Sequence, residues 1–318
     1  MAIATNQQIA NYYDFYRDTE IIFSREILRV LRVDPRQIYI KCNGAQWPCI
    51  VNSTSFQMAK IILGTKGGAF AQVTQENVPP VSLRFCFIEQ GNEKLSFFIS
   101  GKVTEVTPYL NSKELAILTL SFTQRPPDDF ILKLGSVIEA NVNFAQRKED
   151  RIIITKDAKY RLGIEREEVV IFVQNVPRKC ILRDLSFSGA KVVLLGLPKF
   201  VQNKEITLRI QFTDPYETVD IKGSVLSADF IEGRKDIVTA SIKFNETEVP
   251  IAYKIHINNY IMMSKKSLLE ISEHAQQKAT MQTQETTKSA QAVTTDVGKT
   301  LPAQSEFPLQ DNEVNAQT

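Results

Sequence analysis

The sequence predicts a mainly β protein made of two similar domains in tandem. Two observations support this fold class: a long series of short strand-like runs, and an internal repeat that relates the two halves of the chain. With 318 residues, the chain is long enough for two domains that each have their own core.

Short apolar runs that alternate or are rich in β-branched residues dominate residues 20–245. Examples are RQIYIKC, VSLRFCFI, EEVVIFV and DIVTASIKF. Their length and spacing are typical of β-sandwiches or barrels rather than of βαβ units. Helical patterns occur at about residues 5–15 and 249–272. In the second of these we expect an apolar stripe, formed by Ile251, Ile255, Tyr260 and Ile261.

The internal repeat is visible in three pairs of segments that occur in the same order. PCIVNSTSFQMAKIIL aligns with KCILRDLSFSGAKVVL so that Cys49 falls on Cys180, an offset of 131 residues. SLRFCF then aligns with TLRIQF at an offset of 125, and ISGKV with IKGSV at 122. An offset that falls in small steps is what a duplicated domain with shortened loops produces. The repeat is too long for a solenoid and therefore indicates two tandem domains.

The apolar segment SVIEANVNF precedes the boundary between the copies, which we place near residues 136–146. We therefore expect domains at residues 1–140 and 141–272. From about Glu273 the sequence is rich in Gln, Thr, Ala and Ser, with one aromatic residue. Such a segment cannot bury enough apolar surface to offset the entropy of ordering, so we expect residues 273–318 to be a disordered tail.

Composition and charge exclude several classes of protein. A net charge of +2 gives no sign of a polyanion partner, so any nucleotide site must be made locally by a few arginines. The polar N-terminus and the lack of a long apolar run predict neither secretion nor membrane insertion, and we expect a cytoplasmic protein. The four cysteines form no CxxC pair, which disfavours zinc and disulfides. We expect Cys49 and Cys180 to be core residues.

Two motifs stand in and just before the second copy. Arg147 and Arg151 form an RxxxR, and Asp184, Ser186 and Gly189 form a DxSxxG that begins 33 residues after Arg151. Each is weak alone, since an RxxxR in a charged linker is usually solvated and a DxSxxG is more often a turn between strands. In this order, ahead of a β-rich domain, they resemble the two-part signature of PilZ domains.

The resemblance extends to the end of the second copy and covers roughly residues 145–265. The run TVDIKGSVLSADFIEGRKDIVTASIKFNETEVPIAYKIHINNYI resembles the last two strands of a PilZ barrel and the helix that follows them. The two-copy layout is similar to the two-domain PilZ receptors of spirochaetes, whose N-terminal half is itself PilZ-like. The resemblance implies a bacterial protein with two tandem PilZ-like six-stranded β-barrels and flanking helices.

The ligand implied by the resemblance is cyclic di-GMP, and the five motif residues match the positions with which the family binds it. The chemistry agrees with this assignment. The planar fork of an arginine fits phosphate oxygens and the O6 and N7 atoms of guanine. Asp184 can accept hydrogen bonds from guanine N1–H and the exocyclic amine, and Ser186 adds a hydroxyl. Gly189 would let the backbone approach a purine closely.

Three neighbouring residues are possible secondary contacts. Gln146 stands where some PilZ domains carry a further arginine, which the family associates with an intercalated ligand dimer. Its presence favours a single ligand molecule per site. Lys148 and Arg183 could add positive charge, although an ordinary exposed role fits each of them somewhat better.

The first copy lacks the ligand-binding residue types. The repeat places Ser53 opposite Asp184 and Met58 opposite Gly189. It also places Tyr16 opposite Arg147 and Glu20 opposite Arg151, and a glutamate would repel a phosphate. We therefore predict that the first domain is PilZ-like but does not bind the nucleotide.

No catalytic, metal-binding or P-loop arrangement is visible, so we expect a non-enzymatic receptor without cofactors. Because the arginines stand at the domain boundary, we expect the ligand to change the orientation of the domains and the binding of an unidentified protein partner. We expect a monomer. Two alternatives remain open: an interaction adaptor that does not use the nucleotide, and a barrel that binds single-stranded nucleic acid, against which the near-neutral charge argues.

Overall fold

The computed structural model describes residues 6–75, 79–147 and 150–265. The predicted C-terminal tail lies outside these residues. No helix among them is long and apolar enough to cross a membrane.

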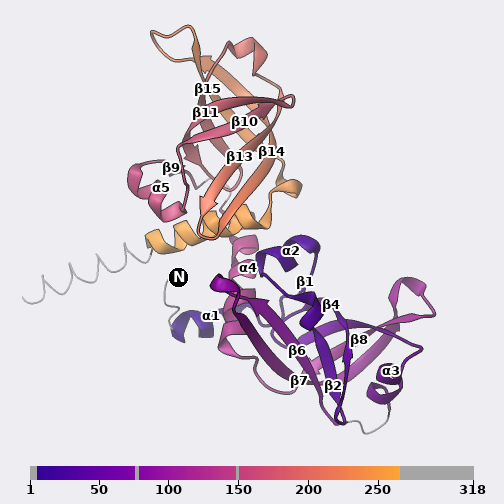
Figure 1. The fold of residues 1–318 in the computed structure, drawn as a ribbon. Helices are drawn as coiled ribbons and strands as arrows, with labels where there is room; N and C mark the ends of the chain where they lie inside the picture. The colour runs from indigo at the N-terminus through magenta and orange to yellow at the C-terminus, as the bar shows by residue number, and fades with distance from the viewer. Residues whose placement is uncertain (1–5, 76–78, 148–149, 266–318) are drawn as a thin grey trace, which may run out of the picture. The chain divides into compact units, whose positions relative to one another are not determined.

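The first domain contains a sheet with the strand order β1-β4-β5-β8-β7-β6-β2-β3. Its helices and strands, shown in indigo to magenta in Figure 1, are α1 (Asn6–Tyr16), β1 (Ile21–Ile22), α2 (Arg25–Val30), η1 (Pro35–Gln37), β2 (Tyr39–Cys42), β3 (Ala45–Pro48), β4 (Ile50–Thr54), β5 (Met58–Gly64), α3 (Gly68–Val73), β6 (Val81–Ile88), η2 (Gln90–Asn92), β7 (Lys94–Pro108), η3 (Tyr109–Asn111), β8 (Leu115–Phe122) and α4 (Asp128–Gln146).

The second domain contains a sheet with the strand order β10-β13-β14-β15-β12-β11-β9, and β10 also pairs with β11. Its elements are β9 (Ile152–Ile153), α5 (Lys156–Leu162), β10 (Glu168–Val173), β11 (Val176–Leu185), β12 (Gly189–Leu195), η4 (Pro198–Phe200), β13 (Glu205–Thr213), β14 (Tyr216–Phe230), β15 (Ile237–Phe244), η5 (Glu246–Glu248) and a C-terminal helix described over residues 251–265.

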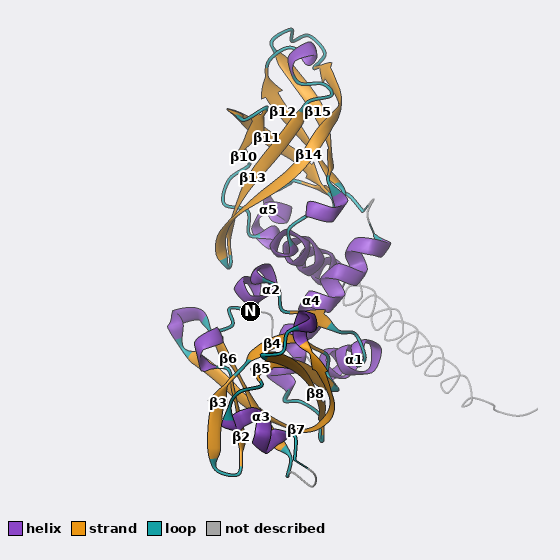
Figure 2. Cartoon of the chain, turned by 90° about the vertical axis from the view of Figure 1, so that its right-hand side faces the viewer, coloured by secondary structure: helices purple, strands orange, loops and turns teal. Residues whose placement is uncertain are grey.

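The two sheets share one topology, which confirms the predicted tandem pair of barrels (Figure 2). In the second domain the long strand β11 pairs with both β10 and β12, so six strands form a closed barrel. In the first domain the equivalent of β11 is broken into β3 and β4, with only Cys49 between them. Strand β3 pairs with β2, and β4 pairs with β5.

Irregularities in the strands repeat at the offsets found in the sequence. A bulge between Val51 and Ser53 in β4 has its counterpart between Leu182 and Asp184 in β11. A bridge between Val33 and Phe87 in the first domain recurs between Ile164 and Phe212 in the second. These pairs reproduce the offsets of 131 and 125 residues, so the sequence alignment holds residue by residue in these strands.

Each domain has its own hydrophobic core, built from the inward-facing residues of its strands. Cys49 and Cys180 are buried in these cores, as predicted. Burial raises the pKa of each of these two thiols to about 12. The four cysteines are buried and free, so the described structure contains no disulfide.

The long helix α4 was not predicted from the sequence. It spans Asp128–Gln146, including the segment SVIEANVNF that was interpreted only as an apolar run before the domain boundary. Two acidic residues in its first turn stabilise the helix, because their negative charges lie at the positive end of the helix dipole. Its apolar residues fall at helical spacing and are buried; they are Phe130, Ile131, Leu134, Val137 and Ile138. Alternation over a few residues concealed this longer period.

The short helices α2, α3 and α5 were also not predicted. Helices α2 and α5 start at equivalent positions, where Ser24 and Thr155 accept hydrogen bonds from the backbone amides of Ile27 and Ala158. In the C-terminal helix Ile251 and Ile261 are buried as expected, and Ile255 and Tyr260 are partly buried against the cores. The buried face also includes Tyr253 and Ile257, which the stripe omitted.

Candidate ligand-binding site

The DxSxxG motif forms the tight turn between β11 and β12. The backbone amide of Ser186 donates to the carbonyl of Gly189 at 2.8 Å. The Ser186 hydroxyl accepts from the amide of Gly189 at 3.1 Å and donates to its carbonyl at 3.2 Å. Ser186 is fully buried. Its hydroxyl therefore fixes the shape of the turn.

A residue of the C-terminal helix supports this turn. The hydroxyl of Tyr253, whose side chain is fully buried, donates to the carbonyl of Ser186 at 2.7 Å. Burial, together with the negative charge of Asp184, raises the pKa of Tyr253 well above its ordinary value. The phenol therefore stays neutral and remains a donor. Sequence reasoning missed this residue, because an aromatic on an amphipathic helix is usually a simple core residue.

Gly189 is required by the packing of the backbone. A Cβ at this position would collide with the carbonyl oxygen of Ile242 in the neighbouring strand β15. Gly189 pairs with Lys243 in that strand, so the collision arises where β12 begins. From the sequence we expect this glycine to let the backbone approach a purine closely. The contact with Ile242 is a separate structural reason, and both reasons can hold together.

Arg151 and Asp184 meet although 33 residues separate them. Arg151 directly precedes β9, whose Ile153 pairs with Asp184 in β11. The Arg151 Nη1 atom donates to the Asp184 Oδ1 atom at 2.7 Å. The arginine side chain is 45% exposed and the carboxylate 16% exposed, so the pair lies at the surface with its carboxylate partly enclosed.

Arg147 ends helix α4, where its backbone amide donates to the carbonyl of Asn143 at 2.8 Å. Its side chain is partly exposed and makes no hydrogen bond or ion pair with the other four motif residues. Its positive charge opposes the rise that burial and Glu139 cause in the pKa of Tyr16. Gln146 and Arg183 are exposed. Lys148 lies outside the described residues.

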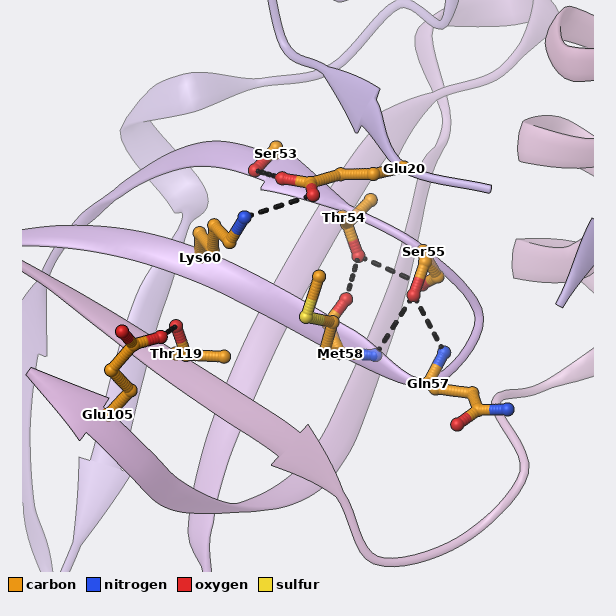
Figure 3. Close-up of polar contacts among 9 residues, drawn as sticks. All are labelled: Glu20, Ser53, Thr54, Ser55, Gln57, Met58, Lys60, Glu105 and Thr119. Atoms are coloured by element: carbon orange, nitrogen blue, oxygen red, sulfur yellow. Dashed lines mark hydrogen bonds and ion pairs between the residues drawn. The ribbon is translucent and has the colours of Figure 1, made fainter. Parts of the chain in front are cut away.

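The first domain carries the same turn with a different set of charges (Figure 3). The amides of Gln57 and Met58 donate to the Ser55 hydroxyl at 3.1 and 3.2 Å, as Gly189 donates to Ser186. Glu20, at the position of Arg151, accepts a hydrogen bond from Ser53, at the position of Asp184. Lys60 donates to the same carboxylate at 2.9 Å.

The electrostatics of Glu20 follow from these contacts. Partial burial acts to raise its pKa, but the hydrogen bonds from Ser53 and Lys60 and the charge of Lys60 outweigh burial, so the pKa of Glu20 is lowered. The first domain therefore places a carboxylate, paired with Lys60, at the position where the second domain places the Arg151 guanidinium. Among the described residues no group of three or more His, Cys, Asp or Glu could hold a metal ion.

The chain belongs to the PilZ-domain family. Residues 7–141 match the PilZN3 domain and residues 145–262 match the PilZ domain.

The chain is 39% identical over 268 residues to the cyclic di-GMP binding protein of Treponema denticola, a match that covers 84% of this chain and 85% of that protein. Among solved structures it is similar to the PlzA protein of Borreliella burgdorferi in complex with c-di-GMP, with 24% identity and a TM-score of 0.36 over 80% of this chain and 98% of that one. It is also similar to YcgR of Escherichia coli in complex with c-di-GMP, with 14% identity and a TM-score of 0.26 over 78% and 92% of the two chains.

Proposed function

We propose that this protein is a non-enzymatic receptor for cyclic di-GMP, and that the second domain binds the ligand through Arg147, Arg151 and Asp184 beside the turn that Ser186 and Gly189 shape. One observation carries the proposal: Arg151 and Asp184 meet at 2.7 Å beside the motif turn. The equivalent positions of the first domain hold Glu20 and Ser53 instead. The name of the relative from Treponema denticola agrees with this ligand.

Binding would replace the ion pair by contacts to the nucleotide. An ion pair at the surface contributes about 0–1 kcal/mol, and the Arg151 side chain of this pair is 45% exposed, so opening the pair costs little. The guanidinium of Arg151 has five donors and uses one of them on Asp184, which leaves the rest of the fork for a phosphate or a guanine edge. The Asp184 carboxylate would accept from the guanine N1–H and exocyclic amine. Adenine lacks this pair of donors, which gives the site its selectivity.

The linker connects this site to the rest of the molecule. Helix α4 ends at Gln146 and β9 begins at Ile152, so both arginines belong to the five residues between these elements. When the arginines close on the phosphates, the linker is fixed in one conformation. We propose that this changes the relative orientation of the two domains and exposes or hides a surface for a protein partner, to the extent of the ligand's differential affinity for the two states.

Calorimetric titration of the full chain with cyclic di-GMP tests the binding proposal. Wild type should bind, and Arg147→Ala should weaken binding by about tenfold or more, because it removes a charge-assisted contact. Arg166→Ala, which changes an exposed arginine of the same domain, is the matched control and should leave affinity unchanged.

Cyclic di-AMP and a single-stranded RNA are the ligand controls. If cyclic di-GMP fails to bind to wild type, the result favours an adaptor that does not use the nucleotide. If RNA binds and cyclic di-GMP does not, the result favours the nucleic-acid interpretation. Either result overturns the receptor proposal. Small-angle scattering of the full chain tests the orientation change separately, since an unchanged profile at saturating ligand contradicts it.

A further inference from the structure

The outer faces of the two barrels differ at one set of equivalent strand positions. In the second domain Arg209 of β13 stands directly opposite Asp220 of β14. In the first domain the same register places Arg84 of β6 opposite Phe98 of β7. The arginine is present in both copies, whereas its carboxylate partner is present in one.

The second domain neutralises the cations on this face. The Nε and Nη2 atoms of Arg209 donate to the two oxygens of Asp220, both at 2.7 Å. The hydrogen bond from Arg209 lowers the pKa of Asp220, against the effect of partial burial. Lys179 of the adjacent strand β11 pairs with Glu168 of β10 at 2.9 Å. Both of these cations are therefore paired with carboxylates.

At the corresponding place in the first domain, Arg84 and Lys41 have no carboxylate partner among the described residues. Arg84 donates to the side-chain oxygens of Gln37 at 2.7 Å and Ser96 at 2.9 Å, which are neutral acceptors. Its guanidinium also lies 5.2 Å from the ring centre of Tyr39. The ammonium of the exposed Lys41 lies 5.0 Å from the ring centre of Phe98. Neither cation is paired with any carboxylate of the described residues.

These four side chains, Tyr39, Lys41, Arg84 and Phe98, form what we call the cationic aromatic patch. Tyr39 pairs across the strands with Arg84, and Arg84 pairs with Phe98, so one row crosses β2, β6 and β7. The other outward-facing residues around the row are neutral; they are Gln46, Pro48, Ser82, Ser96 and Ser100. Asp34, in the turn that leads to β2, pairs with Lys94 at 3.4 Å.

We propose that the cationic aromatic patch docks an acidic segment of a partner protein. The argument is charge complementarity: two uncompensated cations surrounded by neutral residues attract carboxylates, and Phe98, which is 44% exposed, supplies apolar contact beside them. The proposal rests on the proposed function in one respect, since the patch would be the surface that binds the protein partner. Binding of an acidic segment by the patch does not itself depend on cyclic di-GMP.

Single-stranded nucleic acid fits the patch less well than an acidic peptide. Such ligands stack their bases on open aromatic faces and follow a groove of many cations. Here Arg84 lies over the ring of Tyr39 and Lys41 lies over the ring of Phe98, and the two rings contact each other edge to face with centres 6.1 Å apart. The patch therefore offers charge at its surface more than open rings.

A reciprocal exchange between the two domains tests the proposal in the full chain. Phe98→Asp gives Arg84 the partner that Arg209 has, and Asp220→Phe removes that partner from the second domain. The probe is a fluorescein-labelled peptide of alternating glutamate and serine, measured by fluorescence anisotropy, with the same peptide carrying glutamine as its control. Wild type should bind the glutamate peptide and not the glutamine peptide. Phe98→Asp should bind the glutamate peptide about tenfold more weakly. Asp220→Phe should bind this peptide more strongly than wild type does.

Cyclic di-GMP titration and thermal unfolding of each variant separate this proposal from the proposed function, since both should be unchanged in Phe98→Asp. If that variant fails to fold, Lys41→Gln combined with Arg84→Gln replaces it, with the same expected loss. Equal binding of the glutamate peptide by wild type and variant, or no binding by wild type, overturns the proposal. Binding of a short oligouridine RNA in place of the peptide overturns it in favour of a nucleic-acid surface.

Discussion

The two barrels carry the same turn at the same place in the fold, and they differ in the charges beside it. In the second domain the half-exposed Arg151 pairs with the more enclosed Asp184. In the first domain Glu20 is held by Ser53 and Lys60. The backbone around both sites follows one register, down to the bulge in β4 and β11.

This comparison separates what maintains the fold from what makes a ligand site. The apolar framework and the serine of the turn are present in both copies, so they belong to the barrel. Arg151 and Asp184 of the second copy are replaced by Glu20 and Ser53 in the first, so we assign the arginine and the aspartate to ligand binding. We propose that this difference lets the second domain bind the nucleotide while the first does not.

Replacing the glycine of the turn should have the largest effect on stability. Gly189→Ala drives a Cβ into the carbonyl of Ile242 and should destabilise the second domain by about 3 kcal/mol. The equivalent Met58→Gly in the first domain should cost only about 1 kcal/mol, through the entropy of glycine in a strand. Differential scanning calorimetry of the full chain measures both, and equal effects would show that the two turns are not packed differently.

Tyr253→Phe should have an intermediate effect. It leaves the buried carbonyl of Ser186 without its donor, which should cost about 2 kcal/mol and weaken cyclic di-GMP binding by a few-fold through the turn. Tyr260→Phe on the same helix is the control, since its hydroxyl makes no hydrogen bond with a described residue. Chemical denaturation and calorimetric titration report the two quantities. If Tyr253→Phe is less stable but binds cyclic di-GMP as wild type does, Tyr253 stabilises the core and has no effect on the ligand site.

The smallest effect is expected in the first domain and depends on pH. Because the folded state lowers the pKa of Glu20 below its ordinary value of 4.5, the carboxylate contributes stability that is complete above pH 4.5 and is lost as the pH falls through the folded-state pKa. The Glu20 side chain is 32% exposed, so the free energy of unfolding of wild type should exceed that of Glu20→Gln by only about 0.5 kcal/mol at pH 7. Unfolding at several pH values tests this, and a difference that grows in acid would contradict it.

The sequence was sufficient for the mainly β fold class and the duplication, because strands leave a period-2 pattern and the repeated segments occur in the same order. The six-stranded barrels came from the resemblance to PilZ domains. The resemblance of the two motifs to the PilZ signature also placed Arg151 and Asp184 in one site, and the structure joins them through the pairing of β9 with β11. The sequence was not sufficient for α4, whose helical period is masked by a short alternating stretch. Nor did it show that Gly189 is fixed by Ile242 or that Tyr253 supports the turn, because contacts between distant segments leave no local signal.

The central claim is that the charges at Arg151 and Asp184 decide which barrel binds cyclic di-GMP. The double variant Arg151→Glu with Asp184→Ser gives the second site the residues of the first at those two positions, and calorimetric titration of this full-length variant tests the claim. We predict one ligand site in the second domain of wild type and no detectable binding by the folded variant. Binding by the variant with the affinity of wild type would contradict the account.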